Sequence, residues 1–239
     1  GKCMSGHSKW NNIKNKKEKS DAQKGKIFTK IGREIAVAVK EGGADPSTNS
    51  RLRDCIAKAK ANNMPNDNIT RSIKKASGEL GDINYESIVY EGYGAGGTAV
   101  LVDVLTDNRN RTASEMRHAF DKNGGSMGAS VCVAWMFDRK GVLIISRESG
   151  ADEDELMNAA IEAGADDFNA DEDVFEITTD PAEFSAVRET LEAAGYVFES
   201  AEQDMIPQNT VDLDEKQASQ VERLLEVLED NDDVQNVYH

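Results

Sequence analysis

Apolar positions in the first third of the chain recur every three or four residues, the period of a helix that is buried on one face. A first helix is predicted to begin after Asp21, its N-cap candidate, and to stop at Gly42-Gly43, because a carboxylate suits a helix cap and glycine suits a left-handed end. A second is predicted at about 51–62, and a third is capped by Asp67 and ends at Gly78. Three helices with short connections predict a small bundle.

From Tyr85 onward the apolar residues form short runs that are typical of strands, separated by further helical segments. The predicted strands are 88–90, 99–102, 131–137, 142–145, 174–179, a segment near 197–200, and 234–238. The predicted helices are 112–122, 153–163, 181–194 and 215–229. Residues 138–141 are predicted to form a hairpin turn between two of the strands. This order predicts an α+β fold, with two ferredoxin-like α+β sandwiches after the helical bundle.

The charge is divided unevenly along the chain, whose formal net charge is −16. Residues 1–80 hold 18 Lys and Arg against 8 Asp and Glu, a net of +10, and residues 81–239 carry the balance of −26. A basic surface attracts phosphate, whereas the acidic remainder repels it. The division therefore predicts a nucleic-acid-binding N-terminal part; composition drift without function is the alternative.

Basic residues of the N-terminal part gather in the first 35 residues and continue along the next two helices. They are the candidate nucleic-acid-binding residues Lys9, Lys14, Lys16, Lys17, Lys24, Lys26, Lys30, Arg33, Arg51, Arg53, Lys58, Lys60, Arg71, Lys74 and Lys75. Lys26, Arg33 and Lys40 recur every seven residues and form a basic stripe on the first helix. Since lysine outnumbers arginine 14 to 4 in residues 1–80, phosphate contact is favoured over the reading of base sequence.

Three further candidates each have two interpretations. Trp10 interrupts the basic run, where an exposed ring would stack on single-stranded bases, worth roughly 1–3 kcal/mol per base. Because tryptophan is largely buried on average, Trp10 would otherwise belong to the core of the bundle. Arg109 and Arg111 are isolated cations just before a helix in the acidic part. They would form a second nucleic-acid contact, or they would pair with nearby carboxylates.

The remaining motifs predict neither an enzyme nor a cofactor. Residues 92–97 match G-x-G-x-x-G but lie between two strands, which favours a glycine-rich hairpin over a dinucleotide site. The segment that starts at Asp167 resembles a calcium loop but has Glu172 where glycine is required. The three histidines lie in separate elements, so no metal site is predicted.

Cysteine usage and hydropathy predict where the protein works. Cys3, Cys55 and Cys132 are isolated and odd in number, which indicates a reducing compartment and a cytoplasmic location. The longest apolar runs, such as 142–145, are far shorter than the ~18 residues of a membrane-spanning helix.

Several separate motifs, which occur in order from about Met4 to the C-terminus, resemble those of the YebC/PmpR family. They are residues 6–10 (GHSKW), 24–30 (KGKIFTK), 51–53 (RLR), 63–65 (NMP), 69–75 (ITRSIKK), 90–94 (YEGYG), 107–112 (DNRNRT) and 123–125 (NGG). The resemblance implies three domains, the third inserted into the second. These are a basic helical nucleic-acid-binding domain at 1–81, an α+β domain at 82–136 plus 208–239, and an inserted α+β domain at 137–207.

The resemblance leaves two functions open. Bacterial members of the family are commonly described as probable transcriptional regulators that bind DNA, which implies a DNA-binding regulator here. The mitochondrial relative is a translational activator, and other bacterial relatives help ribosomes through proline-rich stretches. That implies a ribosome-associated factor whose basic domain contacts ribosomal RNA while its acidic domains face ribosomal proteins. The division of charge suits the second function slightly better, because a ribosome offers both kinds of partner.

Overall fold

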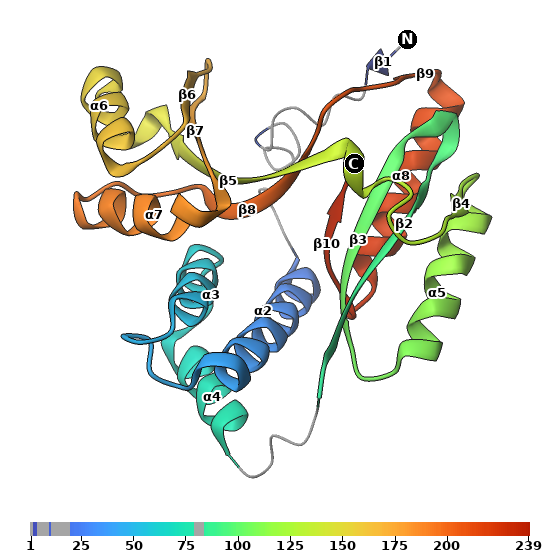
Figure 1. Cartoon of the computed structure of the whole chain (residues 1–239), viewed down its shortest axis with the longest axis horizontal. Helices are drawn as coiled ribbons and strands as arrows, with labels where there is room; N and C mark the ends of the chain where they lie inside the picture. Colours follow the sequence, from blue (N-terminus) through green and yellow to red (C-terminus); the bar gives the residue numbers. More distant parts are fainter. Residues whose placement is uncertain (1, 4–9, 11–19, 79–83) are drawn as a thin grey trace.

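Three N-terminal helices precede two four-stranded antiparallel sheets in the computed structural model, which describes residues 2–3, 10, 20–78 and 84–239 (Figure 1). The predicted α+β class is thereby confirmed. The helices lie below and between the two sheet-bearing parts in Figure 1.

The N-terminal bundle consists of α2 (Asp21–Gly42), α3 (Ser50–Ala61) and α4 (Asn66–Ser77). Ser20, one residue before the predicted cap, begins α2 by accepting a hydrogen bond from the backbone N–H of Gln23. Gly43 ends α2 at φ 87°, where glycine adopts positive φ without steric cost. The buried face of the bundle contains Ile31, Ile35, Ala38, Val39, Leu52, Cys55, Ala59, Met64 and Ile69.

The first sheet has the strand order β10-β3-β2-β4. Its strands are β2 (Glu86–Tyr93), β3 (Ala99–Thr106), β4 (Ser126–Met127) and β10 (Val234–Tyr238). Helices α5 (Arg109–Lys122) and α8 (Glu215–Asp230) pack on one face of it through residues such as Phe120 and Leu224. The glycine-rich segment turns β2 into β3 at Ala95–Gly97, as predicted, and no helix that could hold a pyrophosphate follows it.

The second sheet follows the order strand, helix, two strands, helix, strand. It comprises β5 (Phe137–Ser146), α6 (Glu153–Ala163), β6 (Asp167–Ala170), β7 (Val174–Thr179), α7 (Phe184–Ala193) and β8 (Ser200–Pro207). The spatial order β6-β7-β5-β8 is that of a ferredoxin-like sandwich, with α6 and α7 on one face. Because the whole unit lies between β4 and α8 in sequence, β10 returns to complete the first sheet.

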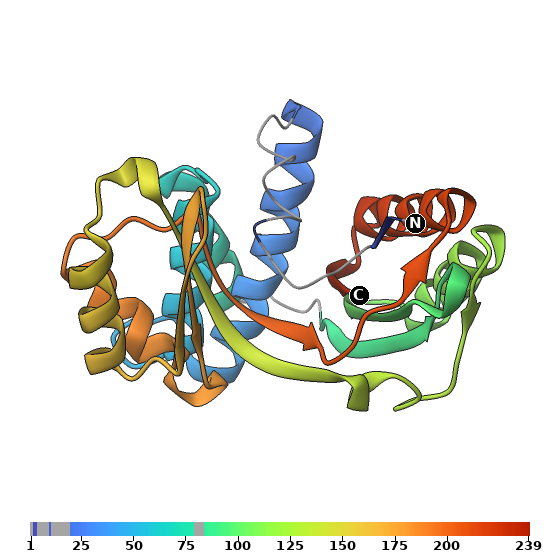
Figure 2. The ribbon, with the colours of Figure 1, turned by 90° about the horizontal axis from the view of Figure 1, so that it is seen from above.

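A two-stranded ribbon of β5 and β8 joins the two sheets (Figures 1 and 2). The strands pair from Phe137 with Pro207 to Ile144 with Ser200. At one end Phe137 packs with Leu101 and Tyr238 beneath the first sheet, and Met205 packs against the same cluster. An apolar core therefore fixes the ribbon at its first-sheet end.

Three predictions about strands were wrong. The strand predicted near 197–200 begins only at Ser200 and runs to Pro207. The predicted turn at 138–141 lies inside β5, because its charged residues occupy the solvated middle of the ribbon between two cores. The predicted strand at 131–137 begins only at Phe137, after a 3-10 turn at Ala134–Met136. The calcium-like segment from Asp167 is strand β6. The domain boundaries stay a prediction.

A separate sheet consists of two short strands. β1 (Lys2–Cys3) pairs with β9 (Asp212–Leu213), which precedes α8. Further 3-10 turns lie at Arg147–Ser149 and Pro181–Glu183.

Candidate nucleic-acid interface

Two residues of the basic stripe, Lys26 and Arg33, lie against the C-terminal end of α8 and the residues that follow it, whereas Lys40 is exposed and donates to Asn84 Oδ1 at 2.9 Å. Lys26 Nζ lies 2.5 Å from Asp230 Oδ1 and 2.9 Å from the Asp230 carbonyl oxygen. Lys30 Nζ donates to the Glu229 carbonyl oxygen at 2.5 Å, and burial lowers the pKa of this lysine despite the acidic groups around it. Three cations predicted to bind phosphate (Lys26, Lys30 and Arg33) are therefore already occupied by acceptors within the same chain.

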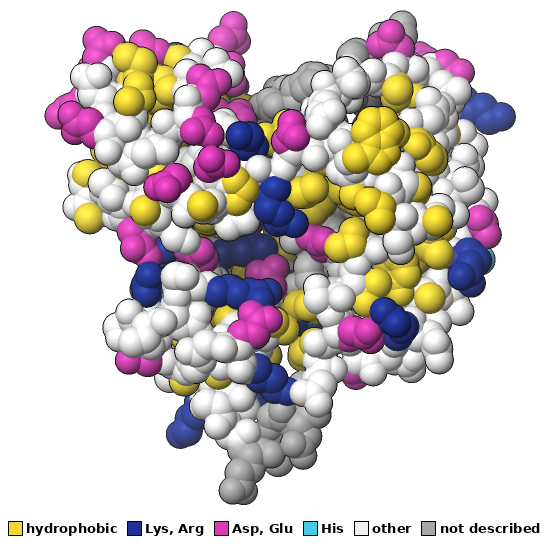
Figure 3. Space-filling model, in the orientation of Figure 1, with side chains coloured by type: hydrophobic (Ala, Val, Ile, Leu, Met, Phe, Trp, Pro, Cys, Tyr) yellow, Lys and Arg dark blue, Asp and Glu magenta, His cyan; other side chains and the backbone are white. Residues whose placement is uncertain are grey.

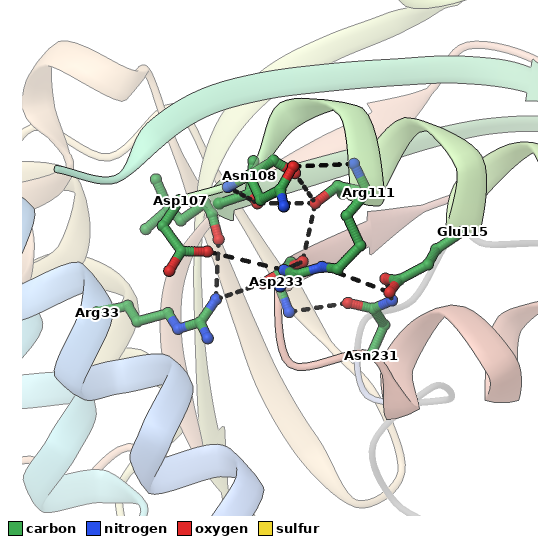
Figure 4. A network of polar contacts seen from close by, with 10 residues as sticks. Arg33, Asp107, Asn108, Arg111, Glu115, Asn231 and Asp233 are labelled. Carbon is green, nitrogen blue, oxygen red and sulfur yellow. Dashed lines mark hydrogen bonds and ion pairs between the residues drawn. The ribbon is translucent and has the colours of Figure 1, made fainter. Parts of the chain in front are cut away.

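Asp233 is the centre of this contact (Figure 4). It is 2% exposed and accepts hydrogen bonds from Arg33 Nη1 at 2.7 Å, Arg111 Nη2 at 2.5 Å and Thr112 Oγ1 at 2.9 Å. Burial alone would raise the pKa of its carboxyl, but these hydrogen bonds outweigh burial and hold the pKa below its usual value. Arg33 also donates to the Leu105 carbonyl oxygen at 3.0 Å, so α2 is tied to the end of β3 as well.

Helix α3 contacts the second sheet in the same manner. Asp54 accepts from Arg188 Nη2 at 3.1 Å and from the Ser185 hydroxyl at 2.6 Å, while Arg53 Nε lies 2.7 Å from Glu189. The Arg188 side chain is only 4% exposed. The arrangement brings the predicted cation Arg53 to a carboxylate of α7 and leaves it unavailable to phosphate.

Lys58 lies where α3 meets β8. Its Nζ is 3.2 Å from Glu34 and 3.7 Å from Glu202. Burial by itself lowers the pKa of Lys58, but Glu202 and Glu34 outweigh that effect and raise it above the usual range. Figure 3 shows Lys and Arg side chains among Asp and Glu side chains in the hollow where the three parts of the molecule meet.

Five predicted cations remain exposed, and they form no ion pair with any residue that the structure describes. They are Lys24 on α2, Lys60 at the end of α3, and Arg71, Lys74 and Lys75 on α4. Arg71, Lys74 and Lys75 are spaced by three and four residues, so they share one face of α4. Arg51 is also exposed but pairs with Glu41 at 2.5 Å. The α4 face is therefore the uncompensated basic surface within the described ranges.

Trp10 is the one candidate before residue 20 that the structure describes, since Lys9, Lys14, Lys16 and Lys17 lie outside the described residues. Trp10 is 8% exposed and packs against Val142, Ile144 and Val174 of the second sheet. The ring is buried, as the second interpretation expected, but in the sheet and not in the bundle core. In this conformation the Trp10 ring is not exposed for stacking on a base.

The exposed tryptophan in the described part of the chain is Trp135, at 65%. Its indole N–H donates to the Cys132 carbonyl oxygen at 3.1 Å. Buried Glu91 accepts from three backbone N–H groups between residues 131 and 134 and so fixes the preceding loop. Val131 in that loop is 67% exposed and has φ 66°, a strained conformation for a β-branched residue.

Both arginines of the proposed second contact pair with carboxylates, as their alternative interpretation expected. Arg109 Nη2 lies 3.1 Å from Glu86, and Arg111 binds Asp233 besides lying within 4 Å of Asp107 and Glu115. The sequence shows that Arg109 and Arg111 are cations in an acidic part of the chain, but it does not show which carboxylates they pair with.

Two family models together cover most of the chain. The model described as TACO1/YebC protein N-terminal domain matches residues 8–79, and the model described as TACO1/YebC second and third domain matches residues 85–239. The chain belongs to the TACO1/YebC family.

Relatives of known name are similar over nearly their whole length. Probable transcriptional regulatory proteins of Thermoanaerobacter pseudethanolicus and Acetivibrio thermocellus are 58% and 60% identical over 236 and 237 residues. Each match covers 99% of this chain, and 96% and 98% of the respective relative. The crystal structure of a conserved hypothetical protein from Aquifex aeolicus has a TM-score of 0.84 at 49% identity, covering 96% of this chain and 95% of that one.

Both relatives are named as regulatory proteins. No group of three or more metal-binding side chains occurs within the ranges that the structure describes. Among the same residues, no helix is both long and apolar enough to cross a membrane.

The residues that sequence reasoning missed in this TACO1/YebC protein are the acidic partners. Asp233, Asp54 and Glu189 determine which cations are occupied, yet each is one acid among 44 in the chain. The available signal was the opposite charge of the two parts, which indicated attraction between them as well as attraction to phosphate.

Proposed function

We propose that this protein is a nucleic-acid-binding regulator of gene expression and that the α4 face, defined as Arg71, Lys74 and Lys75, contacts the phosphates. The observation that carries the proposal is the exposure of these three cations without a carboxylate partner among the described residues. Most cations on α2 and α3 have carboxylate partners, among them Lys26, Arg33, Arg51, Arg53 and Lys58. Uncompensated cations repel one another and are stabilised when phosphate neutralises them.

DNA is the target that the relatives' names favour, because two of them are called probable transcriptional regulatory proteins. The second candidate is ribosomal RNA, with ribosomal proteins facing the acidic part. The net charge of −26 over residues 81–239 favours this candidate, since a bare duplex repels such a surface and a basic protein attracts it. A cytoplasmic location is part of the proposal, because the isolated cysteines indicate a reducing compartment.

Salt-dependent binding tests the α4 face directly. The triple variant Arg71→Gln/Lys74→Gln/Lys75→Gln is compared with Lys122→Gln/Lys216→Gln/Arg223→Gln, which removes three equally exposed cations from α5 and α8. On a 24-base-pair duplex, the first variant is expected to flatten the plot of log affinity against log salt by up to about 2.7, since each phosphate left without its cation removes about 0.9. Equal slopes for the two variants would refute the proposal.

A parallel experiment separates the two targets. The protein is sedimented with ribosomes through a sucrose gradient, and its affinity for promoter DNA is compared with its affinity for random DNA. A specific regulator binds its site roughly 10³–10⁷ times more tightly than random sequence. Sedimentation with ribosomes, together with equal affinity for both DNAs, would exclude the transcriptional target.

A further inference from the structure

The contact between the helical bundle and the rest of the molecule is polar. The buried apolar cluster of the bundle contains only residues of α2, α3, α4 and their connections. No apolar cluster among the described residues joins α2–α4 to either sheet. The two sheets, by contrast, share the cluster around Phe137 and Tyr238. Interfaces of polar composition are the ones at which domains separate most readily.

The hydrogen-bond acceptors at the C-terminal end of α8 carry negative charge, as phosphate oxygens do. Helix α8 ends with Glu226, Glu229 and Asp230 and has no basic residue in its last turn, so its negative dipole end is not compensated by its own side chains. Lys26 and Lys30 of α2 supply the missing positive charge. Carboxylate and carbonyl oxygens thus bind the ammonium groups of Lys26 and Lys30, to which phosphate oxygens would otherwise bind.

Asp233, Lys58 and Arg188 each keep a partner on their own side of the contact. If the bundle moved away, Asp233 would retain Arg111 and Thr112. Lys58 would retain Glu34 at 3.2 Å.

On α7, Arg188 would likewise retain Glu192, at 2.6 Å. Separation therefore leaves these three groups paired, while Arg33 and Asp54 of the bundle exchange Asp233 and Arg188 for solvent, which lowers the electrostatic cost of opening the contact.

Other pairs at the contact are largely exposed. Lys26 and Asp230 have side chains 39% and 75% exposed, and Arg53 and Glu189 are 34% and 40% exposed. Such pairs contribute little and are screened by salt. Arg33 with Asp233 is the buried exception, at 17% and 3%.

We propose that the structure is a closed state in which carboxylates of the sheets occupy a second phosphate-binding surface on α2 and α3. Nucleic acid first held by the α4 face displaces the acidic residues, the bundle separates from the sheets, and Lys26, Lys30, Arg33 and Arg53 turn to the phosphate backbone. The proposal rests on the proposed function, because it concerns the same ligand and extends its surface.

The test weakens the closed state without touching any cation. The variant Asp230→Asn/Glu189→Gln removes two exposed carboxylates of the contact. Its matched control, Glu222→Gln/Glu172→Gln, removes two exposed carboxylates that pair with no cation among the described residues, and it changes the net charge by the same amount. Affinity for the 24-base-pair duplex is expected to rise at least about threefold over the control, with a salt slope steeper by about 0.9 for each additional phosphate that the protein neutralises.

A distance measurement reports the opening itself. Nitroxide labels are placed at Thr29→Cys on α2 and Val227→Cys on α8, both exposed, in a background where Cys3 and Cys132 are serine; Cys55 is buried. Adding duplex is expected to lengthen the distance between the labels. In the Asp230→Asn/Glu189→Gln variant, the same lengthening is expected at a lower duplex concentration.

The two proposals fail in different ways. If the contact variant binds no better than its control and the label distance is unchanged at saturating duplex, the closed state is permanent and this inference is overturned. The Arg71→Gln/Lys74→Gln/Lys75→Gln comparison is unaffected by that result, because it depends on α4 alone.

Discussion

The pair formed by Arg33 and Asp233 is expected to hold α2 to the first sheet more strongly than any exposed pair does. Asp233 is 2% exposed and the Arg33 side chain 17%, and their atoms lie 2.7 Å apart. A hydrogen bond that involves a charged group contributes about 1.5–3 kcal/mol when it is removed from water. Arg111 remains on Asp233 after Arg33 is lost, but Arg111 is 46% exposed and adds at most about 1 kcal/mol.

A double-mutant cycle measures this coupling. Arg33→Met, Asp233→Asn and the double variant are unfolded in urea beside the parent protein, and free energies are compared where the m-value is unchanged. Arg33→Met is expected to cost about 2 kcal/mol, because Asp233 keeps two of its donors. The coupling energy between the two sites is expected to be about 1.5–3 kcal/mol.

Arg51 with Glu41 provides the control cycle. This pair has an even shorter distance of 2.5 Å, but its side chains are 50% and 60% exposed. Its coupling is expected to be no more than about 0.5 kcal/mol, since solvent screens both charges. If the buried pair showed no greater coupling than the exposed one, burial would not be the source of the stabilisation and the reasoning would be refuted.

Two further changes are predicted. Because hydrogen bonds hold the pKa of Asp233 below its usual value, its contribution to stability is complete above the unfolded pKa of about 4 and is lost as the pH falls through the lower native pKa. The difference in urea stability between the parent and Asp233→Asn should thus be constant from about pH 7 to 5 and shrink in stronger acid; a difference that grew on acidification would contradict this sign. Val131→Gly should stabilise the protein by up to about 1 kcal/mol in thermal unfolding, because it relieves a left-handed strain of about 1–2 kcal/mol at the cost of glycine's greater chain entropy. Val197→Gly, also at an exposed position, serves as the control, and equal effects would show that the φ angle of Val131 carries no strain.

Much of the fold follows from local patterns in the sequence. Helix α8 and strand β10 lie where periodicity predicted them, because each presents a regular apolar face to the same core. The middle of β5 escaped this reasoning. Residues 138–141 are charged or glycine, as in a turn, yet they cross the solvated gap between two cores while paired with β8. Only the long-range pairing shows that they form a strand.

The candidate interface was less predictable than the fold. Charge counting located the basic part of the chain but not its acidic partners, which are about 200 residues away in sequence for Lys26 and Arg33. Which cations stay exposed depends on that pairing, so the α4 face emerged from the tertiary structure. The burial of Trp10 against Val142 and Val174 is likewise a long-range contact with no local signal.

The chain leaves the first sheet through β5 and returns to it through β8, so the second sheet is an insertion in the chain of the first. Its two ends, Phe137 and Pro207, are paired neighbours, and partners in an antiparallel ladder have Cα atoms about 4.5–5.5 Å apart. A chain that lacked everything between them would need only a tight turn to close the gap, while β10 would still reach β3. Inserting or removing this unit would therefore change a single hairpin and would leave the order of the surrounding strands unchanged.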